Sequence, residues 1–388
     1  MKLNGLDYLD IYNNLEENEV MVQKSTRDFV DKSILPIIEQ HFEDGTFPSE
    51  LITQLAQMGF LGINLPKKDG CSGLNNIIYG LVCQEIERGD SAIRSFISVQ
   101  NSLVMYPISS FGSKKQKEDF LPQLVTGDLI GCFGLTEPDH GSDPSGMKTR
   151  AKKVDDGYIL NGSKMWITNG SIADIAIIWA KTDNNMLGFI VEKGMDGFKS
   201  VEMKHKWSLR ASDTSELILE DVFVPNENVL PNVEGLKGPL SCLNQARYGI
   251  GWGAIGSAMA VYEASIKYTN ERLQFNKPIA SFQLIQDKLV WMLTEITKGQ
   301  LLALQVGKCK DAGTVTAQQI SLVKRNNTWV ARECAKLARE IHGANGISGE
   351  YPIMRHLMNI ESVYTYEGTY DMHTLILGHD ITGISAFR

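Results

Sequence analysis

The chain has 388 residues, of which 43% are hydrophobic and 22% charged, so it is long enough for more than one globular domain. With 38 Lys and Arg against 46 Asp and Glu, its formal net charge is −8, and it has no basic run of the kind that binds nucleic-acid phosphates. No apolar stretch approaches the roughly 20 residues of a membrane-spanning helix. We therefore expect a protein that neither binds nucleic acid nor spans a membrane.

The cysteines and histidines argue against a disulfide framework and a metal site. The six cysteines are scattered without a CxxC pair, which predicts free thiols in a reducing compartment. The seven histidines form no HExxH motif and no cluster with zinc spacing, so we expect no metal. The N-terminal segment MKLNGLDYLDIYNNLEENEV is acidic and lacks a long apolar core, unlike a secretory signal or a transit peptide. These features predict a cytoplasmic protein if the source is bacterial, or a mitochondrial-matrix protein if a eukaryotic form has been processed.

The periodicity of apolar residues predicts three domains. Residues 17–125 show amphipathic helical patterns, interrupted by the Gly-rich segment 63–76. From about 128 to 231 the pattern alternates as in strands, and Asn161-Gly162 and Asn169-Gly170 are typical of hairpin turns. Long helical patterns then predict a bundle, at 239–272, 281–311, 315–342 and 371–385. We expect a mainly α protein with a middle β domain, divided into an N-terminal helical domain (1–127), a β domain (128–233) and a C-terminal helical domain (234–388).

Two motifs that suggest nucleotide phosphates are poor candidates in this context. GWGAIG (251–256) matches G-x-G-x-x-G, but the segment before it is helical in pattern, whereas a dinucleotide site needs a preceding strand. Close helix packing through small residues is the better interpretation. GYILNGSK (157–164) has the order Gly-Ser-Lys and lies in a strand pattern, so it does not predict a phosphate loop.

Two segments of the middle domain offer groups that suit a flat polar ligand. CFGLTEPDHGSD (132–143) supplies Thr136, Ser142 and backbone amides for a polar ring or a phosphate, although on its own it is better interpreted as a turn with local hydrogen bonds. KMWITNG (164–170) places Trp166 and Thr168 two residues apart, on one strand face. That pair suits stacking plus a hydrogen bond, and a Trp packed in the sheet core is an equal alternative.

Three segments of the helical domains are candidates of the same kind. ERLQFNKPIASFQ (271–283) puts Arg272 at the end of a long helix, where it can bind phosphate or simply complement the helix C-terminus. HGANG (342–346) permits close approach of a ligand, or is a helix C-cap. SAIRSFISVQNS (91–102) lines up one guanidinium, Arg94, with several serines on an otherwise apolar helix. This arrangement favours an anionic carboxylate pocket, and the alternative is an Asp90–Arg94 pair on a solvated face.

One carboxylate near the C-terminus stands out. VYTYEGTYDMH (363–373) holds Glu367 among aromatic and hydroxyl side chains. It is either a polar residue in a turn or a base directed at a substrate, and the stretch alone favours the turn.

Together these segments resemble the acyl-CoA dehydrogenase family over essentially the whole chain, most closely its members that oxidise glutaryl-CoA. The resemblance is densest in RSFISVQNSLVMYPI, CFGLTEPDHGSDPSGMKTRA, LNGSKMWITN, NQARYGI, RLQFNKPIASFQLIQ and TYEGTYDMHTLILGHDITGISAF. It implies an N-terminal helical domain, a middle β-barrel or sandwich domain and a C-terminal four-helix bundle. It also implies FAD as the cofactor, a homotetramer, and electron-transfer flavoprotein as the electron acceptor.

The resemblance also implies the roles of individual residues. The residues expected to hold FAD are Phe133, Leu135, Thr136, Ser142, Trp166, Ile167, Thr168, Arg272, Gln274, Phe275, Gln283, Glu340, Gly343, Ala344, Thr369 and Asp371, with Arg272, Gln274, Phe275 and Gln283 reaching the cofactor of a neighbouring subunit. The residues expected to bind the acyl-CoA are Glu87, Arg94, Ser95, Ser98, Ser142, Asn244, Arg247, Tyr366 and Gly368.

The implied reaction has Glu367 remove the α-proton of glutaryl-CoA while FAD accepts the β-hydride. Arg94, with Ser95 and Ser98, would anchor the distal carboxylate, and loss of CO2 followed by protonation from Glu367 would give crotonyl-CoA. The alternatives are a non-decarboxylating glutaryl-CoA or short-chain dehydrogenase, a short-chain acyl-CoA oxidase that uses O2, and a catalytically silent CoA-ester-binding protein.

Overall fold

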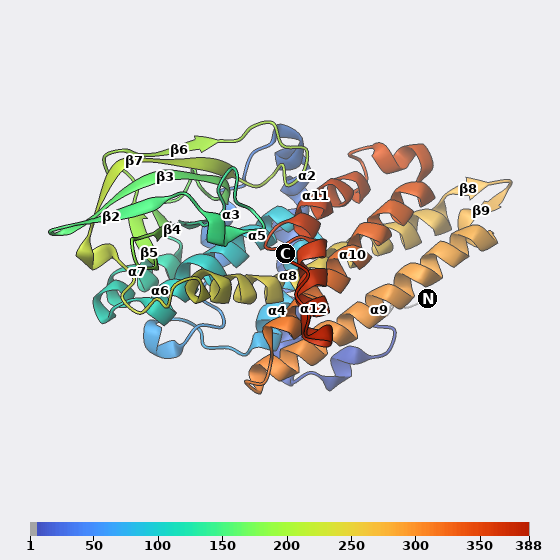
Figure 1. Cartoon of the computed structure of the whole chain (residues 1–388). Coiled ribbons are helices and arrows are strands. Elements are labelled where there is room, and N and C mark those ends of the chain that lie inside the picture. The colour runs from blue at the N-terminus through green and yellow to red at the C-terminus, as the bar shows by residue number, and fades with distance from the viewer. Residues whose placement is uncertain (1–5, 388) are drawn as a thin grey trace.

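The computed structural model describes residues 6–387, and its elements follow the predicted order of helices, sheet and helices (Figure 1). Two short π-helical stretches, Val30–Ile34 and Val99–Met105, join consecutive helices of the N-terminal part. That part contains α1 (Glu17–Phe29), α2 (Leu35–Asp44), α3 (Leu51–Gln57), α4 (Asn76–Gly89), α5 (Ser91–Ser98), α6 (Tyr106–Phe111) and α7 (Lys114–Thr126).

The middle of the chain forms one mixed sheet of seven strands. Its order is β1-β4-β2-β3-β7-β6, and β5 also pairs with β4. Four of the pairs are antiparallel, whereas β1 and β2 each run parallel to β4. The strands are β1 (Gly131–Gly134), β2 (Arg150–Val154), β3 (Gly157–Thr168), β4 (Ile175–Lys181), β5 (Met186–Glu192), β6 (Phe198–Glu202) and β7 (Thr214–Pro225).

The prediction of a hairpin turn at Asn161-Gly162 is wrong. Both residues lie inside β3, at a shift in the register between β3 and β7. Gly162 has φ 148°, and a Cβ there would lie 2.5 Å from Thr149 Oγ1, so this position requires glycine. A glycine that permits a β-bulge and one that permits a turn leave the same local signature. Asn169-Gly170 does end β3, but the next strand pairs with β1, β2 and β5, so no hairpin forms there either.

The C-terminal part is helical, with a small hairpin of β8 (Leu273–Gln274) and β9 (Lys277–Pro278) at the end of the molecule away from the sheet (Figure 1). Its helices are α8 (Lys237–Glu271), α9 (Gln283–Asp311), α10 (Ala317–Ile341), α11 (Ile353–Thr365) and α12 (Tyr370–Thr382). The shorter α11 was not among the predicted long helical runs. No helix of residues 6–387 is long and apolar enough to cross a membrane.

The motif GWGAIG lies within α8, which confirms its interpretation as a helix-packing segment. A Cβ at Gly256 would lie 1.8 Å from the backbone oxygen of Gln84, and a Cβ at Gly253 would lie 2.1 Å from Glu87 Oε2. The glycines therefore allow α8 to approach α4 closely. This contact packs Glu87 of α4 against α8, where it pairs with Arg94.

Candidate active site

A large cavity, with a volume of about 1320 Å³, is lined by residues of the N-terminal helices, the sheet and the C-terminal helices. Its apolar inner wall includes Val99 and Leu103 from the second π-helical stretch. The predicted site residues that line it are Ser95, Phe133, Leu135, Thr136, Ser142, Trp166, Ile167, Thr168, Asn244, Arg247, Tyr366, Glu367, Gly368 and Thr369. Segments far apart in the sequence thus meet at one site.

Glu367 lies in the short turn between α11 and α12, in a left-handed backbone conformation with φ 54°. The backbone oxygen of Glu367 accepts a hydrogen bond from Arg247 Nε at 2.7 Å. Lys324 Nζ donates to the carbonyl groups of Tyr366 and Gly368 at 2.9 and 2.7 Å. Thr369 caps α12 by accepting a hydrogen bond from the backbone of Met372. The turn is therefore held from α8 and α10 as well as by its own helices.

The electrostatic environment of Glu367 suits a general base. Its Oε2 is buried without a hydrogen-bond partner among the described residues. Burial raises the pKa of Glu367, whereas the positive charges of Arg94, Arg247 and Lys324 oppose the increase, and the pKa is about 7. Such a carboxyl group can take and return a proton near neutral pH.

Arg94 does not itself line the cavity, and neither do Glu87 and Ser98; its side chain is buried, with an exposed fraction of 1%. Its Nε pairs with Glu87 Oε2 at 2.5 Å, and Nη2 donates to the hydroxyl group of Tyr366. Burial alone would lower the pKa of Arg94, but the charge of Glu87 and its hydrogen bond outweigh that effect and raise it, so the guanidinium stays charged. No hydrogen bond joins Nη1 to another residue of 6–387.

The alternative for this helix, an Asp90–Arg94 pair on a solvated face, is wrong. The Asp90 carboxylate caps α5 through the backbone N–H of Ala92 and accepts hydrogen bonds from Arg355 and Asn359. The whole stretch from Ser91 to Ser102 is buried. Ser95 lines the cavity, and the hydroxyl oxygen of Ser98 is buried without a partner among the described residues.

Trp166 does not pack in the sheet core, so that alternative is also wrong. Its exposed fraction is 61%, and its φ of 63° falls at the register shift between Lys164 and Ile167. The irregular strand turns the indole towards the cavity, which Thr168 and Thr136 also line. An exposed aromatic plane, nearby hydroxyl groups and the size of the cavity fit a flavin.

The loop between β1 and β2, which carries Thr136 and Ser142, is held by a buried ion pair that the sequence analysis missed. Lys164 Nζ contacts Glu137 Oε1 at 2.9 Å and the backbone oxygen of Leu135 at 3.1 Å. Burial raises the pKa of Glu137, but hydrogen bonds from Lys148 and Thr149 and the charge of Lys164 outweigh it and lower the pKa to about 2. The turn interpretation holds in part, because Asp143 accepts a local hydrogen bond from Ser145.

The remaining predicted cofactor residues do not line this cavity. Arg272, Gln274, Phe275 and Gln283 lie on the β8–β9 hairpin and at the start of α9, at the far end of the helices (Figure 1). Glu340, Gly343 and Ala344 lie at the end of α10 and in the 3-10 turn after it, and Asp371 lies in the first turn of α12. Glu340 pairs with Lys288 at 2.6 Å. Their roles in FAD binding stay predictions.

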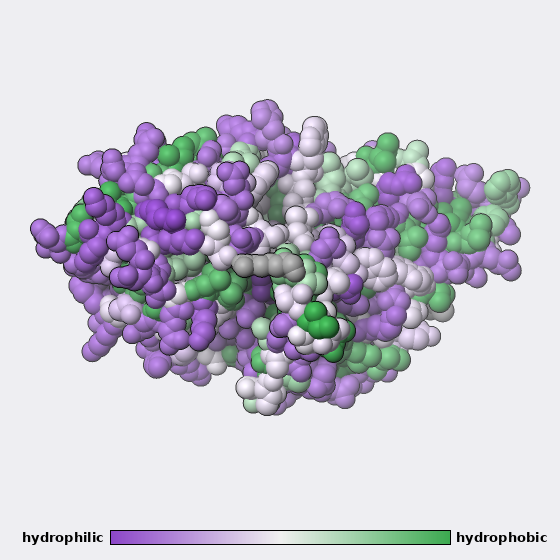
Figure 2. Space-filling model, in the orientation of Figure 1, coloured by the Kyte–Doolittle hydropathy of each residue, from purple (hydrophilic) through white to green (hydrophobic). Residues whose placement is uncertain are grey.

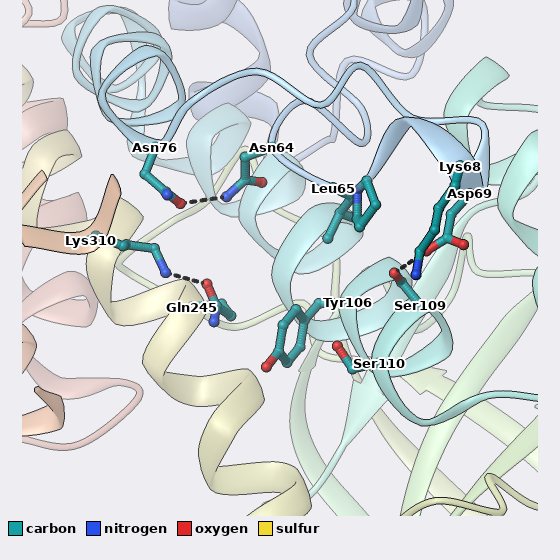
Figure 3. Close-up of a pocket in the computed structure, with 11 residues that line it drawn as sticks. Asn64, Leu65, Lys68, Asp69, Asn76, Tyr106, Ser109, Ser110, Gln245 and Lys310 are labelled. Atoms are coloured by element: carbon teal, nitrogen blue, oxygen red, sulfur yellow. Dashed lines mark hydrogen bonds between the residues drawn. The ribbon is translucent and has the colours of Figure 1, made fainter. Parts of the chain in front are cut away.

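A second cavity, of about 310 Å³, contains none of the predicted site residues. Figure 3 shows that several of its polar side chains bond to one another: Asn64 to Asn76, Lys310 to Gln245, and Ser109 to Asp69. Because these groups satisfy each other, the cavity does not require a charged ligand. The larger cavity is therefore the candidate active site.

Family models match nearly the whole chain: those described as the N-terminal, middle and C-terminal domains of acyl-CoA dehydrogenase match residues 16–128, 132–222 and 234–382. The chain belongs to the acyl-CoA dehydrogenase family. The predicted family, fold class and enzyme class are confirmed.

Individual relatives agree. A crystal structure of a glutaryl-CoA dehydrogenase from Mycobacterium smegmatis in complex with FADH2 is 49% identical, with a TM-score of 0.98 over 99% of both chains. A glutaryl-CoA dehydrogenase from Desulfococcus multivorans is 34% identical over 96% of this chain and 98% of its own length. A short-chain-specific acyl-CoA dehydrogenase from Megasphaera elsdenii is 36% identical over 94% and 98%. The expectation of a flavin cofactor is confirmed at the level of the family.

Substitution of Lys164 tests how far its ion pair holds the loop between β1 and β2. We expect Lys164→Met to destabilise the holoprotein by about 3–5 kcal/mol, because it leaves the buried Glu137 carboxylate without its partner. FAD should also dissociate at a lower temperature, since the loop that carries Thr136 loosens. Thermal unfolding followed by circular dichroism, with flavin fluorescence in parallel, measures both effects. Lys199→Met is the control, because Lys199 forms an exposed pair with Glu220; equal behaviour of the two variants would contradict the prediction.

Proposed function

We propose that this acyl-CoA dehydrogenase oxidises glutaryl-CoA at the α,β bond and decarboxylates the product to crotonyl-CoA and CO2, with Glu367 as the base. The observation that carries the proposal is the buried Arg94 guanidinium, joined through Tyr366 to the turn that presents Glu367. A buried guanidinium that bonds to Tyr366, a residue of the cavity wall, suits an acyl chain that ends in a carboxylate. The similarity to two glutaryl-CoA dehydrogenases supports the same substrate.

The first step is removal of the α-proton by the carboxylate of Glu367. The turn directs this group into the cavity, and a pKa of about 7 leaves a large share of it ionised at neutral pH. Trp166, Thr168, Thr136 and Ser142 would hold the isoalloxazine side of FAD within the same cavity. When bound, FAD supplies the acceptor for the β-hydride.

Arg94 would place the distal carboxylate of the substrate. Glu87 and Tyr366 already occupy its Nε and Nη2, whereas Nη1 is free of hydrogen bonds to residues 6–387. The pair with Glu87 offsets the cost of burying the guanidinium before substrate arrives. Ser95 and Ser98 add hydroxyl groups on the same helix, and the oxygen of Ser98 has no partner among the described residues.

Decarboxylation would follow on the oxidised product, glutaconyl-CoA. The bond to the distal carboxylate breaks, CO2 leaves, and its electron pair spreads as a dienolate onto the thioester. The protonated Glu367 then returns its proton to the γ-carbon, which gives crotonyl-CoA and restores the carboxylate. One carboxyl group thus serves as base and then as acid, which its pKa of about 7 permits.

A second candidate is dehydrogenation of a short-chain acyl-CoA without decarboxylation. The similarity to the short-chain-specific enzyme of Megasphaera elsdenii favours it. In both candidates we propose electron-transfer flavoprotein as the acceptor that reoxidises the enzyme, as the sequence resemblance implies.

Product analysis separates these candidates. Purified holoenzyme is incubated with glutaryl-CoA and a dye that accepts electrons from the reduced flavin, and CoA esters and CO2 are quantified. We expect crotonyl-CoA and CO2 in equal amounts. Accumulation of glutaconyl-CoA without CO2 would exclude decarboxylation, and turnover of butyryl-CoA but not glutaryl-CoA would favour the second candidate. Rapid peroxide formation in air would instead indicate an oxidase.

Replacement of the base tests the role of Glu367. We expect Glu367→Gln to lower kcat by at least about a thousandfold, because the amide cannot accept the α-proton. The variant should stay yellow, since the Glu367 side chain is not among the groups that we expect to hold FAD. Steady-state assays and the flavin absorbance measure the two properties. The exposed Glu350→Gln serves as the control, and substantial turnover by Glu367→Gln would refute the assignment.

Replacement of Arg94 tests substrate choice. We expect Arg94→Gln to reduce kcat/KM for glutaryl-CoA by about a hundredfold more than for butyryl-CoA, because only the former has a distal carboxylate. Arg88→Gln is a matched control: Arg88 is also buried and pairs with Glu85 and Asp31, but unlike Arg94 it bonds to no residue that lines the cavity. Its substitution should affect both substrates alike. An equal loss on the two substrates in Arg94→Gln would show that Arg94 does not select the carboxylate.

A further inference from the structure

Lys324 is a fully buried lysine whose hydrogen bonds go to the turn that carries Glu367 and to the end of the helix before it. It lies on α10, and its exposed fraction is 0%. Its ammonium group donates to the backbone oxygens of Tyr366 at 2.9 Å, Gly368 at 2.7 Å and Tyr364 at 3.5 Å. Two of these carbonyl groups flank Glu367 in the chain. The third belongs to the last turn of α11, where helical carbonyl groups lack intrahelical partners.

These bonds act on a backbone conformation that needs support. Glu367 has φ 54° and Gly368 has φ 97°, and for a residue with a side chain the left-handed region is unfavourable. Such conformations persist where surrounding contacts fix them. Lys324 donates hydrogen bonds to the carbonyl groups on both sides of Glu367, and Arg247 donates one to the backbone oxygen of Glu367 itself.

A purely structural role explains these contacts poorly. The ammonium group bonds only to carbonyl groups, and no salt bridge joins it to a carboxylate among the described residues. Burying a charge in this way is costly, whereas a neutral donor would satisfy carbonyl groups at lower cost. Burial lowers the pKa of Lys324, and the charge of Glu367 partly restores it, to about 7. The charge of Lys324 is thus coupled to that of Glu367.

Each helix that packs against the turn contributes one charged or titratable group close to Glu367. Arg94 comes from α5, Arg247 from α8, Lys324 from α10 and His373 from α12, while Tyr366 is its neighbour in the chain. Arg94 is paired with Glu87, and burial lowers the pKa of His373 to about 2, so the imidazole is neutral. Lys324 and Arg247 are therefore the cations without a carboxylate partner of their own close to Glu367.

We propose that Lys324 is a positioning residue for the reaction: its ammonium group holds the carbonyl groups on both sides of Glu367 in the left-handed turn and supplies a positive charge that keeps the Glu367 carboxylate ionised. This inference rests on the proposed role of Glu367 as the base. Lys324 does not line the cavity, so it acts through Glu367 and not on the substrate.

The test is the pH dependence of kcat in holoenzyme variants, with butyryl-CoA as the substrate so that decarboxylation does not contribute. The rate should rise with pH as Glu367 ionises, with a wild-type midpoint near its pKa of about 7. Lys324→Gln retains a donor but removes the charge, so the midpoint should move up by about one pH unit and kcat at pH 7 should fall about fivefold. KM should change little, because Lys324 does not contact the substrate.

Lys324→Arg separates charge from geometry. Its guanidinium stays protonated throughout, so its midpoint should lie at or below that of the wild type even if its size lowers kcat. Lys336→Gln is the matched control on the same helix, because Lys336 is partly exposed and pairs with Glu333. Its profile should equal that of the wild type. Flavin absorbance and circular dichroism verify folding, and if Lys324→Gln does not fold, the midpoint of Lys324→Arg decides.

Three outcomes would overturn the proposal: an unmoved midpoint in Lys324→Gln, upward shifts in both Lys324 variants, or an upward shift in Lys324→Arg alone. Glu367→Gln, assayed in parallel, separates this inference from the proposed function. If Glu367→Gln keeps its turnover, the assignment of the base fails. If it is inactive while the midpoint of Lys324→Gln is unmoved, only the inference about Lys324 fails.

Discussion

The active site depends on a single left-handed turn between α11 and α12. A non-glycine residue in this conformation costs on the order of 1–3 kcal/mol, so Glu367 stays there only because other elements fix it. Arg247 and Lys324 hold its backbone, and Thr369 starts α12 directly after it. The glycines of α8 contribute indirectly, because they let α8, which carries Arg247, pack closely against α4, which carries Glu87. A strained turn thus links the packing of the helices to the chemistry.

The charges around this turn are balanced so that the pKa of Glu367 stays near neutral pH. A carboxylate surrounded only by apolar groups would hold its proton, and one bonded directly to a cation would not accept one. Here Arg94 is occupied by Glu87 and Tyr366, while Arg247 and Lys324 donate to backbone oxygens of the turn. The cations therefore act on the Glu367 carboxylate through space. This arrangement explains why its Oε2 is buried and unpartnered among the described residues, with a pKa of about 7.

Local sequence patterns predicted the order of the domains and the packing role of GWGAIG, and they singled out Glu367 and Arg94, whose roles the family resemblance then implied. Periodicity and an unusual residue in an apolar context are local signals, which one sequence displays. The bulge at Gly162 was misread because a glycine that permits a bulge looks like one that permits a turn. Lys324 and Lys164 were missed because their partners are 40 to 44 and 27 to 29 residues away in the chain, at positions that only the fold brings together. A lysine in a helix carries no sign of being buried.

Only some of the residues predicted to bind FAD line the cavity. Others lie on the β8–β9 hairpin and at the start of α9, at the end of the molecule away from the sheet. Large apolar side chains there are exposed, including Phe275 at 86% and Leu284 at 79%, and Figure 2 shows hydrophobic residues at that end. Exposed apolar side chains of this size commonly mark a contact with another protein surface. Arg272 and Gln274 lie on the same hairpin, so a partner that covered the apolar side chains would also meet these polar groups. The expectation of a homotetramer in which they reach a neighbouring FAD stays a prediction, but it explains both the exposed surface and the distance of these residues from their own cavity.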